Sequence, residues 1–323
     1  MFRLLAALGM ILVMVVTMDR VLASSLGEML RHSSDRFMTV YRQAAPAEKG
    51  PAETVDVVVL GNSRADNHFP ALDIQNVTCG KTLNLGMGGA PTTIADLLWQ
   101  DYVERHGAPR LLLLEPTSVV DPPHTLADVP LLSYYSERVD DFVRQVDYRM
   151  WASNQVFNTL IFNNNQTIRL AMGLLRPADD RTLSGTMSPF LRQQIEHLPT
   201  EEMVGFQPNW EALDRIVATA REHGTRVAVV ITPFYPGYIK KVSNFDAFFE
   251  DLKRRLPPDV SVIDARHAVE GDEHFADALH INHEGVRVML AHIEDRLRPL
   301  GNCPADAIAQ LGTPTIEHAA ARP

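Results

Sequence analysis

The sequence predicts an α/β protein in which a parallel sheet is sandwiched between two layers of helices, a three-layer α/β/α fold. Short runs that are rich in β-branched residues and apolar on both faces suit strands in the middle of such a sheet. These runs alternate with helix-length segments, and β–α alternation is typical of parallel strands joined by crossover helices. The chain of 323 residues, 46% of them hydrophobic, is long enough to build a sizeable core.

The first half of the alternation contains three predicted strands and one helix. Residues 55–60 form the first strand, because the run is β-branched and stops abruptly at Gly61. Residues 82–85 form a second short strand, and residues 92–106 are predicted to form a helix. Residues 111–114, an apolar run after a Gly-Ala-Pro break, form the third strand.

The second half repeats the pattern further along the chain. Residues 210–223 have the amphipathic spacing of a helix, and residues 226–231 form an apolar strand. A helix at residues 245–256, a strand at residues 260–263 and a final helix at residues 283–297 complete the sequence of elements. The repetition indicates that every strand of the sheet runs in the same direction.

The segment from residue 119 to residue 205 breaks this rhythm. It contains the run Asn163-Asn164-Asn165 and several prolines, and it is too long for a simple connection. We interpret it as a long mixed insertion or lid over the sheet edge, within a single domain that spans residues 54–303. Residues 24–53 are expected to form a juxtamembrane linker or helix, and the Ala-, Pro- and Thr-rich residues 304–323 a flexible tail.

Residues 1–23 differ in composition from the rest of the chain. Arg3 precedes an apolar run of 15 residues, 4–18, and the small or apolar residues up to Ala23 supply a spacing that signal peptidase tolerates. The segment is therefore either a signal peptide cleaved after Ala23 or an uncleaved signal anchor, although membrane spans usually take about 17–25 residues. Both interpretations predict export. A buried core helix is the third interpretation, but the run lacks an amphipathic face.

Charge and cysteine usage limit the partners and sites. The formal net charge of -10, the pI near 5.6 and the absence of a long Lys or Arg run argue against a nucleic-acid partner. Cys79 and Cys303 are the two cysteines of the chain. In an exported protein they could form one bridge, but their spacing does not make a metal site.

A serine follows the first predicted strand in the sequence Gly61-Asn62-Ser63. The carboxyl edge of a parallel sheet is where α/β folds place their ligands, and helix-terminal N–H groups there point at anions. Ser63 is therefore a candidate nucleophile. The alternative is that Asn62 or Ser63 merely caps the next helix.

A nucleophilic serine needs a base, and the base must be oriented. In the sequence DALHINHEG, Asp277 precedes His280 by three residues, after the last strand and before the final helix. Both residues should therefore lie at the same sheet edge as Ser63, with the carboxylate on one ring nitrogen and the other nitrogen facing the serine. The alternative is that Asp277 caps a turn and His280 lies on the surface.

A glycine-rich block follows the second predicted strand. Residues 83–90 read LNLGMGGA, and the spacing of Asn84, Gly86 and Gly89 lets the backbone approach a ligand and turn its N–H groups inward. The block lacks the Gly-Lys-Ser/Thr of a phosphate loop and an acidic residue about 20 positions further on, so no nucleotide cofactor is predicted. A simple tight turn is the alternative.

Taken together and in this order, the three motifs resemble those of the SGNH (GDSL-like) hydrolase family over about residues 54–298. Gly-Asn-Ser stands where that family has Gly-Asp-Ser. The resemblance implies a flavodoxin-like parallel sheet, with Ser63 as nucleophile, His280 as general base and Asp277 as the group that orients it. It also implies that the backbone N–H groups of Ser63 and Gly89 form an oxyanion hole.

One motif departs from the family pattern. Where the family has Gly-x-Asn-Asp after the third strand, this chain reads Glu115-Pro116-Thr117-Ser118, and Thr117 offers only a hydroxyl in place of the Asn amide. Loss of one oxyanion donor costs about 2.7–4 kcal/mol in enzymes that use it. Either the activity is weak, or Thr117, Asn62 or Arg64 substitutes as the third donor.

The resemblance also narrows the function. An exported chain with one N-terminal apolar segment and a degenerate family pattern is similar to bacterial envelope proteins that move or remove acyl groups on surface polysaccharides. We expect a serine esterase or O-acetyltransferase that acts on an acylated carbohydrate or small acyl ester beside envelope biosynthesis proteins. It would lie at the periplasmic face of the inner membrane, or be periplasmic or secreted after cleavage at Ala23.

Two other classes of function remain open. The chain could be a catalytically weak or inactive carbohydrate-binding or assembly component of an envelope complex. A metal site built from His274, His280 and His283 is a further interpretation, but the three have no spacing recognised for zinc. We therefore predict neither a metal nor a cofactor.

Overall fold

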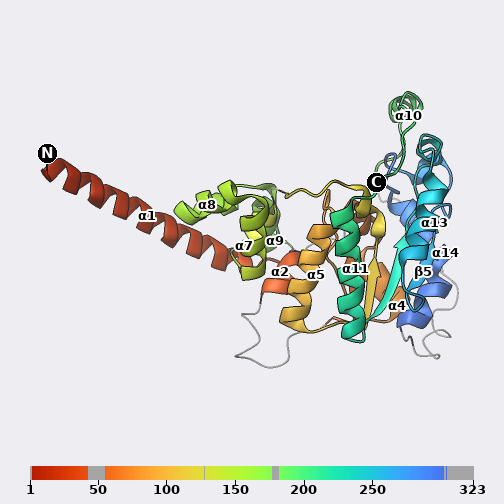
Figure 1. Ribbon diagram of the computed structural model, residues 1–323, viewed down its shortest axis with the longest axis horizontal. Coiled ribbons are helices and arrows are strands. Elements are labelled where there is room, and N and C mark those ends of the chain that lie inside the picture. The colour runs from red at the N-terminus through yellow and green to blue at the C-terminus, as the bar shows by residue number, and fades with distance from the viewer. Residues whose placement is uncertain (1, 43–54, 127, 177–181, 302, 304–323) are drawn as a thin grey trace, which may run out of the picture.

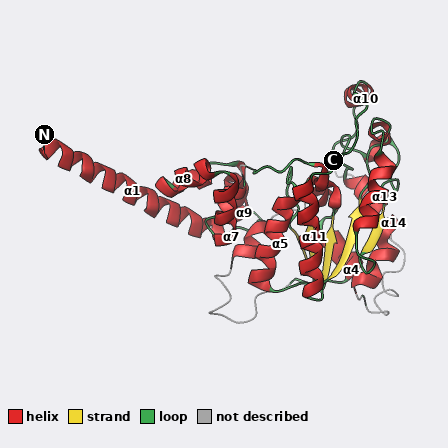
Figure 2. Cartoon of the chain, in the orientation of Figure 1, coloured by secondary structure: helices red, strands yellow, loops and turns green. Residues whose placement is uncertain are grey.

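The computed structural model describes residues 2–42, 55–126, 128–176, 182–301 and 303. Within these residues five parallel strands form one sheet with helices on both faces, which confirms the predicted α/β sandwich (Figures 1 and 2). The strand order is β2-β1-β3-β4-β5, the doubly wound order of flavodoxin-like sheets. The strands are β1 Val57–Leu60, β2 Thr82–Asn84, β3 Leu111–Leu114, β4 Arg226–Ile231 and β5 Ser261–Asp264.

Side chains of the central strands alternate between two hydrophobic cores. In β1, Val58 and Leu60 face one core and Val57 and Val59 face the other, and all four are fully buried. This two-sided burial explains why the strand is apolar at every position. The first core is covered by α5 (Thr92–His106), α11 (Gln207–Glu222) and α13 (Phe245–Arg255), and the second by α4 (Ala71–Thr78) and α14 (His283–Gly301).

The predicted elements lie close to the observed ones. The helix at residues 92–106 and the strands at residues 111–114 and 226–231 have the predicted bounds. The first strand begins two residues later than predicted, because ladder pairing starts at Val57, opposite Thr82 of β2. Helix α14 continues beyond the predicted end, to Gly301.

The predicted insertion at residues 119–205 divides into two parts. The first part, which we call the helical insertion, comprises α6 to α9 and packs on α5 through α7 and on α1 through η2 and α9. The second part contains α10 and lies at the opposite end of the molecule from α1 (Figure 1). It passes beside the loop of His280, where the N–H of His283 donates to the Leu183 carbonyl at 2.7 Å. The elements are α6 Val129–Leu132, α7 Glu137–Val146, α8 Tyr148–Val156, η2 Asn158–Phe162, α9 Asn165–Leu175 and α10 Pro189–Glu196.

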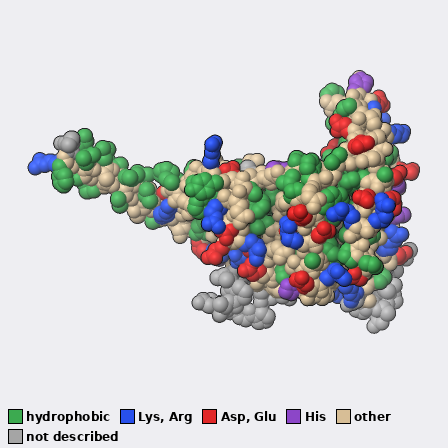
Figure 3. Space-filling view, in the orientation of Figure 1, with side chains coloured by type: hydrophobic (Ala, Val, Ile, Leu, Met, Phe, Trp, Pro, Cys, Tyr) green, Lys and Arg blue, Asp and Glu red, His purple; other side chains and the backbone are tan. Residues whose placement is uncertain are grey.

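Helix α1 (Phe2–Arg31) projects from the domain, and its outer half is covered with hydrophobic side chains (Figures 1 and 3). Its length and composition suit a helix that crosses a membrane, as in a signal anchor or a signal sequence. The helix continues past Ala23, which packs against the domain together with Gly27 and Leu30. The ring of Tyr134 lies so close to Gly27 that a Cβ there would collide with it.

A disulfide joins Cys79 to Cys303, a bridge that the sequence left open. The bridge ties the end of α4 to the chain that follows α14, so it links two helices of the same layer. Residues 24–42 of the predicted linker form the end of α1 and helix α2 (Arg36–Tyr41). The rest of that linker and the predicted tail at residues 304–323 lie outside the described residues.

Candidate active site

Ser63 lies at the carboxyl end of β1, as the first residue of helix α3 (Ser63–His68). Gly61 makes the turn between strand and helix: its φ is +144°, and a Cβ there would collide with the backbone carbonyl of Glu115. Asn62 caps the helix, because its side-chain oxygen accepts the N–H of Arg64 at 2.9 Å. The N–H of Ser63, at the first helical position, has no acceptor within the helix.

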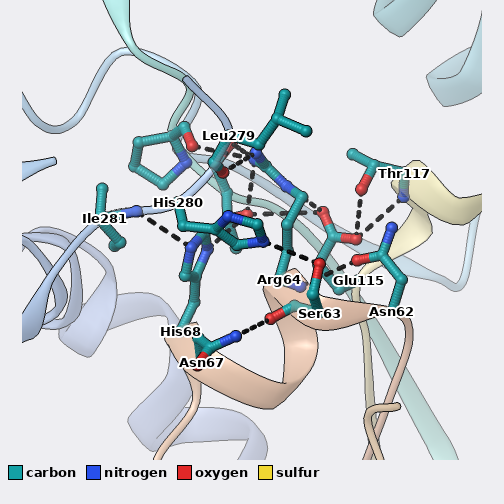
Figure 4. Close-up of polar contacts among 12 residues, drawn as sticks. Asn62, Ser63, Arg64, Asn67, His68, Glu115, Thr117, Leu279, His280 and Ile281 are labelled. Atoms are coloured by element: carbon teal, nitrogen blue, oxygen red, sulfur yellow. Dashed lines mark hydrogen bonds and ion pairs between the residues drawn. The ribbon is translucent and has the colours of Figure 1, made fainter. Parts of the chain in front are cut away.

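Ser63, His280 and Asp277 come together in one chain of hydrogen bonds, and Figure 4 shows the contact of Ser63 with His280. Ser63 Oγ lies 2.7 Å from His280 Nε2, and His280 Nδ1 lies 2.9 Å from each carboxylate oxygen of Asp277. An ionised carboxylate can only accept, so Nδ1 carries the ring proton and Nε2 accepts from the serine hydroxyl. The three side chains thus have the geometry of a nucleophile, a base and a group that orients the base.

The Asp277 carboxylate also holds the loop that carries His280. Its Oδ1 accepts the backbone N–H groups of Leu279 and His280 at 2.8 and 2.9 Å. Burial opposes ionisation of Asp277, but the hydrogen bonds from His280 and Leu279 outweigh it and keep the pKa of this carboxyl below its usual value. Asp277 is therefore ionised at neutral pH and can stabilise an imidazolium on His280.

A second histidine, His68, is buried next to the triad (Figure 4). Its Nε2 accepts the N–H of Ile281 at 3.2 Å, and its Nδ1 lies 3.0 Å from Thr232 Oγ1. Burial, followed by the positive charge of Arg64, holds the pKa of His68 well below its usual value. His68 is therefore neutral, with the proton on Nδ1, and it fixes the residue that follows His280.

Arg64 links the ends of β1, β3 and β4 to the loop of His280. Its Nε lies 3.3 Å from Glu115 Oε1, and its Nη1 donates to the Leu279 carbonyl at 2.5 Å. Its Nη2 donates to the carbonyls of Thr232 and Pro233 at 2.7 and 2.9 Å. Because these contacts occupy the guanidinium inside the protein, Arg64 is not placed to act as an oxyanion donor.

The network of Arg64, Glu115 and His68 was not predicted from the sequence. A signal for it was nevertheless present, because Glu115 follows directly on the buried strand β3 and Arg64 comes four residues after the buried strand β1, and both strands are apolar at every position. A charge at such a place is buried and needs a partner of opposite sign.

The asparagine of the glycine block has a structural role. The Asn84 amide donates to the carbonyls of Ala65 and Phe69 at 2.8 Å each, and its oxygen accepts the N–H of Gly86. Gly86 must be a glycine, because a Cβ there would collide with the backbone of α3 at Asp66. These contacts hold the glycine block against the helix that carries the serine.

The glycines that follow form a turn beside Ser63. The N–H of Ala90 donates to the Met87 carbonyl at 3.0 Å, and Gly89 occupies the third position with a φ of +73°. The bond that closes the turn uses neither the N–H of Gly88 nor the N–H of Gly89. A Cβ on Gly88 would lie 4.0 Å from that of Ser63, so the predicted donor Gly89 belongs to a turn that adjoins the serine.

Thr117, at the position of the missing asparagine, already donates its hydroxyl hydrogen. Thr117 Oγ1 lies 2.6 Å from Glu115 Oε2, and the Thr117 N–H donates to the same oxygen at 3.1 Å, which caps η1 (Pro116–Val120). The Asn62 side chain hydrogen-bonds the Asp121 carboxyl, whose pKa is raised by burial. The side chains of Thr117 and Asn62 are therefore engaged in hydrogen bonds within the protein, and backbone N–H groups are the donors that remain for a ligand oxygen beside Ser63.

The three histidines considered as metal ligands have separate partners. His274 Nδ1 lies 2.5 Å from the Glu270 carbonyl, His283 Nδ1 lies 3.5 Å from Thr182 Oγ1, and His280 is engaged with the serine and the aspartate. Among the described residues, no three His, Cys, Asp or Glu side chains gather into a group that could hold a metal ion.

Comparisons with known proteins do not assign the chain to a family. Neither a scan of protein-family models nor a search of the curated proteins found a match.

Proposed function

We propose that the protein is a serine-dependent ester hydrolase or O-acyl transferase of the SGNH (GDSL-like) type. The observation that carries this proposal is the 2.7 Å contact between Ser63 Oγ and His280 Nε2, with Asp277 on the opposite ring nitrogen. Such a relay at the carboxyl edge of a parallel sheet is the arrangement that activates a serine for attack on a carbonyl.

The reaction would proceed through an acyl-serine intermediate. Ser63 Oγ attacks the ester carbonyl while His280 Nε2 takes the hydroxyl proton, and Asp277 stabilises the imidazolium. His280 then gives this proton to the leaving alcohol oxygen, which departs and leaves the acyl group on Ser63. Attack by water releases an acid, whereas attack by a sugar hydroxyl transfers the acyl group, and His280 accepts the attacking proton in either case.

Two backbone groups would hold the developing oxyanion. The N–H of Ser63 has no acceptor within its helix, and the glycine turn adjoins Ser63, which supports a hole shared between them; Gly89 is the donor that the sequence pattern favours. Thr117 and Arg64 contribute nothing to this hole, because their hydrogens are already donated elsewhere. Such an oxyanion hole has no side-chain donor, and enzymes that use a side-chain donor slow down about 10²–10³-fold when it is removed.

The cell envelope is the setting we propose for this chemistry. The apolar helix α1 supports a membrane-anchored or exported protein, and the Cys79–Cys303 disulfide supports an oxidising compartment such as the bacterial periplasm. An acylated envelope polysaccharide, or a small acyl ester that supplies the acyl group, fits this location as substrate. Envelope biosynthesis proteins would then be its neighbours.

One observation favours a second candidate function. The Thr117 hydroxyl already donates to Glu115, so the site has no third oxyanion donor at the position where the sequence pattern expects one. A weak oxyanion hole would suit a binding or assembly component that no longer turns over substrate. The complete Ser63–His280–Asp277 relay argues for catalysis, because carbohydrate binding does not require it.

A fluorophosphonate probe tests the proposal directly. Full-length protein in detergent should become labelled, and Ser63→Ala should lose all labelling. Ser153→Ala, a change at an exposed serine on α8, is the matched control and should label like the original protein. Absence of labelling of the original protein between pH 6 and 9 would instead support the binding function.

A further inference from the structure

Helix α1 contains a charged pair at the end of its apolar run, and this pair is bonded to the helical insertion. Asp19 accepts the N–H of Asn158 at 2.7 Å and both the N–H and the hydroxyl of Thr159 at 3.1 and 2.5 Å. The neighbouring Arg20 donates to the Gln155 carbonyl at 2.5 Å. The segment at residues 155–160, here called the α8–η2 corner, is therefore fixed to one level along α1.

That level coincides with the expected boundary of a membrane. The apolar run at residues 4–18 spans about 22 Å at 1.5 Å per residue, whereas the hydrocarbon core of a bilayer is about 30 Å thick. With Arg3 at one boundary, about five more residues are needed, so the other boundary falls near Ala23. Asp19 can lie on the membrane side of this boundary because its carboxylate is buried and accepts from three donors of the corner and from Arg20.

The surface of the structure at this level is apolar. In the α8–η2 corner, Val156, Phe157 and Leu160 are 55%, 37% and 45% exposed. On α1, Val21 and Leu22 at the same level are more than half exposed. Apolar side chains of both the helix and the corner are therefore exposed at this level, and exposed apolar groups of this kind mark a contact surface.

Basic side chains lie within reach of the level of the lipid headgroups. Arg149 is exposed two turns before Val156 on the same face of α8, on the side of the corner away from the membrane. The Arg20 side chain is 40% exposed; its backbone lies about 4.5 Å to the membrane side of Ala23, and a long arginine side chain can extend from there to the headgroups. This sequence of apolar and then basic side chains matches the change from acyl chains to anionic headgroups.

We propose that the α8–η2 corner is a membrane-contact surface that inserts Val156, Phe157 and Leu160 into the boundary of the bilayer crossed by α1. Asp19 and Arg20 hold the corner against α1, so that the helical insertion contacts the membrane beside the helix that crosses it. The partner is a lipid bilayer with anionic headgroups, and this function is independent of the chemistry at Ser63. An uncleaved α1 is part of the proposal.

Site-directed fluorescence in the full-length protein tests this surface. Since both native cysteines lie in the disulfide, a single introduced cysteine supplies the thiol for a polarity-sensitive fluorophore. Phe157→Cys and Leu160→Cys report on the corner, and Phe190→Cys on α10, which is 67% exposed at the opposite end of the molecule, is the matched control (Figure 1). The variants are reconstituted into phosphatidylcholine–phosphatidylglycerol vesicles with or without lipids that carry a nitroxide near the headgroup.

We expect blue-shifted emission and loss of fluorescence with nitroxide lipid for the labels at Phe157 and Leu160, and neither for the label at Phe190. Mass spectrometry of the purified chain should show residues 1–23 still attached. Unquenched labels at the corner, equal quenching of all three labels, or a chain cleaved after Ala23 would each overturn the proposal. Corner labels shielded from both nitroxide lipid and aqueous iodide would also overturn it, because a protein would then cover the surface.

Discussion

Replacing Arg64 by methionine should destabilise the protein strongly and slow the reaction of Ser63. The Arg64 and Glu115 side chains are 3% and 0% exposed, so removing the guanidinium leaves a carboxylate with no access to water. Breaking a buried ion pair by removing one partner costs about 3–5 kcal/mol, because the remaining charge is uncompensated. Against a typical stability of about 5–15 kcal/mol, the variant stays folded but with a clearly lower urea midpoint.

A double variant separates the charge effect from lost packing. Glu115→Gln keeps an amide oxygen that can accept from Thr117 but removes the charge. In Arg64→Met/Glu115→Gln no charge is left buried, so we expect the double variant to lose at least about 1 kcal/mol less stability than the sum of the two single changes. Arg254→Met, at a 75% exposed arginine on α13, is the control and should change stability by about 0.5 kcal/mol or less.

The same variant tests how the triad is positioned. Because Arg64 Nη1 holds the carbonyl of Leu279, next to His280, its loss should slow fluorophosphonate labelling under conditions where the protein is still folded. Stability losses of Arg64→Met and Glu115→Gln that simply add in the double variant would refute the buried-charge argument. An unchanged labelling rate in Arg64→Met would refute the positioning role.

Four further predictions follow from single features of the structure. Thr117→Val should lower the free energy of unfolding in urea by about 1–3 kcal/mol, because the hydrogen bond to Glu115 is lost. The variant should still react normally with fluorophosphonate. A strong loss of labelling would show instead that Thr117 stabilises the oxyanion. Gly89→Ala should lower the free energy of unfolding by about 1–2 kcal/mol, because Gly89 has a positive φ. Slower fluorophosphonate labelling than in the original protein would support a place for Gly89 in the oxyanion hole. The Cys79–Cys303 disulfide closes a loop with a sequence separation of 224. By the chain-entropy model, its reduction should lower the free energy of unfolding by about 5 kcal/mol. An unchanged urea midpoint in the presence of reductant would contradict this prediction. The pKa of Asp277 is lower in the folded state than in the unfolded chain, so its contribution to stability is complete above about pH 4 and is lost as the pH falls further. In Asp277→Asn the free energy of unfolding should therefore fall less steeply below about pH 4. An unchanged dependence of stability on pH in this range would refute the prediction.

The sheet and the Ser63–His280–Asp277 arrangement could be predicted because both depend on local sequence and on one rule of topology. Strands that are apolar at every position must be buried on both faces, and parallel strands bring their carboxyl ends to one edge. A serine after the first strand and an Asp-x-x-His after the last strand therefore converge, although 217 positions separate Ser63 from His280.

The supporting contacts could not be predicted, because their partners are set by tertiary packing. Arg64 meets Thr232 across 168 positions, and His68 meets Ile281 across 213. Asp19 directly follows the apolar run at residues 4–18, and in the structure it accepts three hydrogen bonds from residues 158 and 159. A charge within an apolar helix signals that a partner exists, but the sequence does not say which residue it is.

The same kind of contact links the N-terminal helix to the candidate active site. Arg36, at the start of α2 and five residues after α1 ends, lies 2.5 Å from an Asp66 carboxylate oxygen and donates to the Gly86 carbonyl at 2.6 Å. Asp66 belongs to the helix that begins with Ser63, and Gly86 belongs to the glycine block. A short path therefore runs from the end of α1 through Arg36 to both the helix of Ser63 and the glycine block. For the proposed anchored enzyme, this rigid connection would hold Ser63 at a set distance from the membrane, which restricts its substrates to acyl groups presented close to that surface.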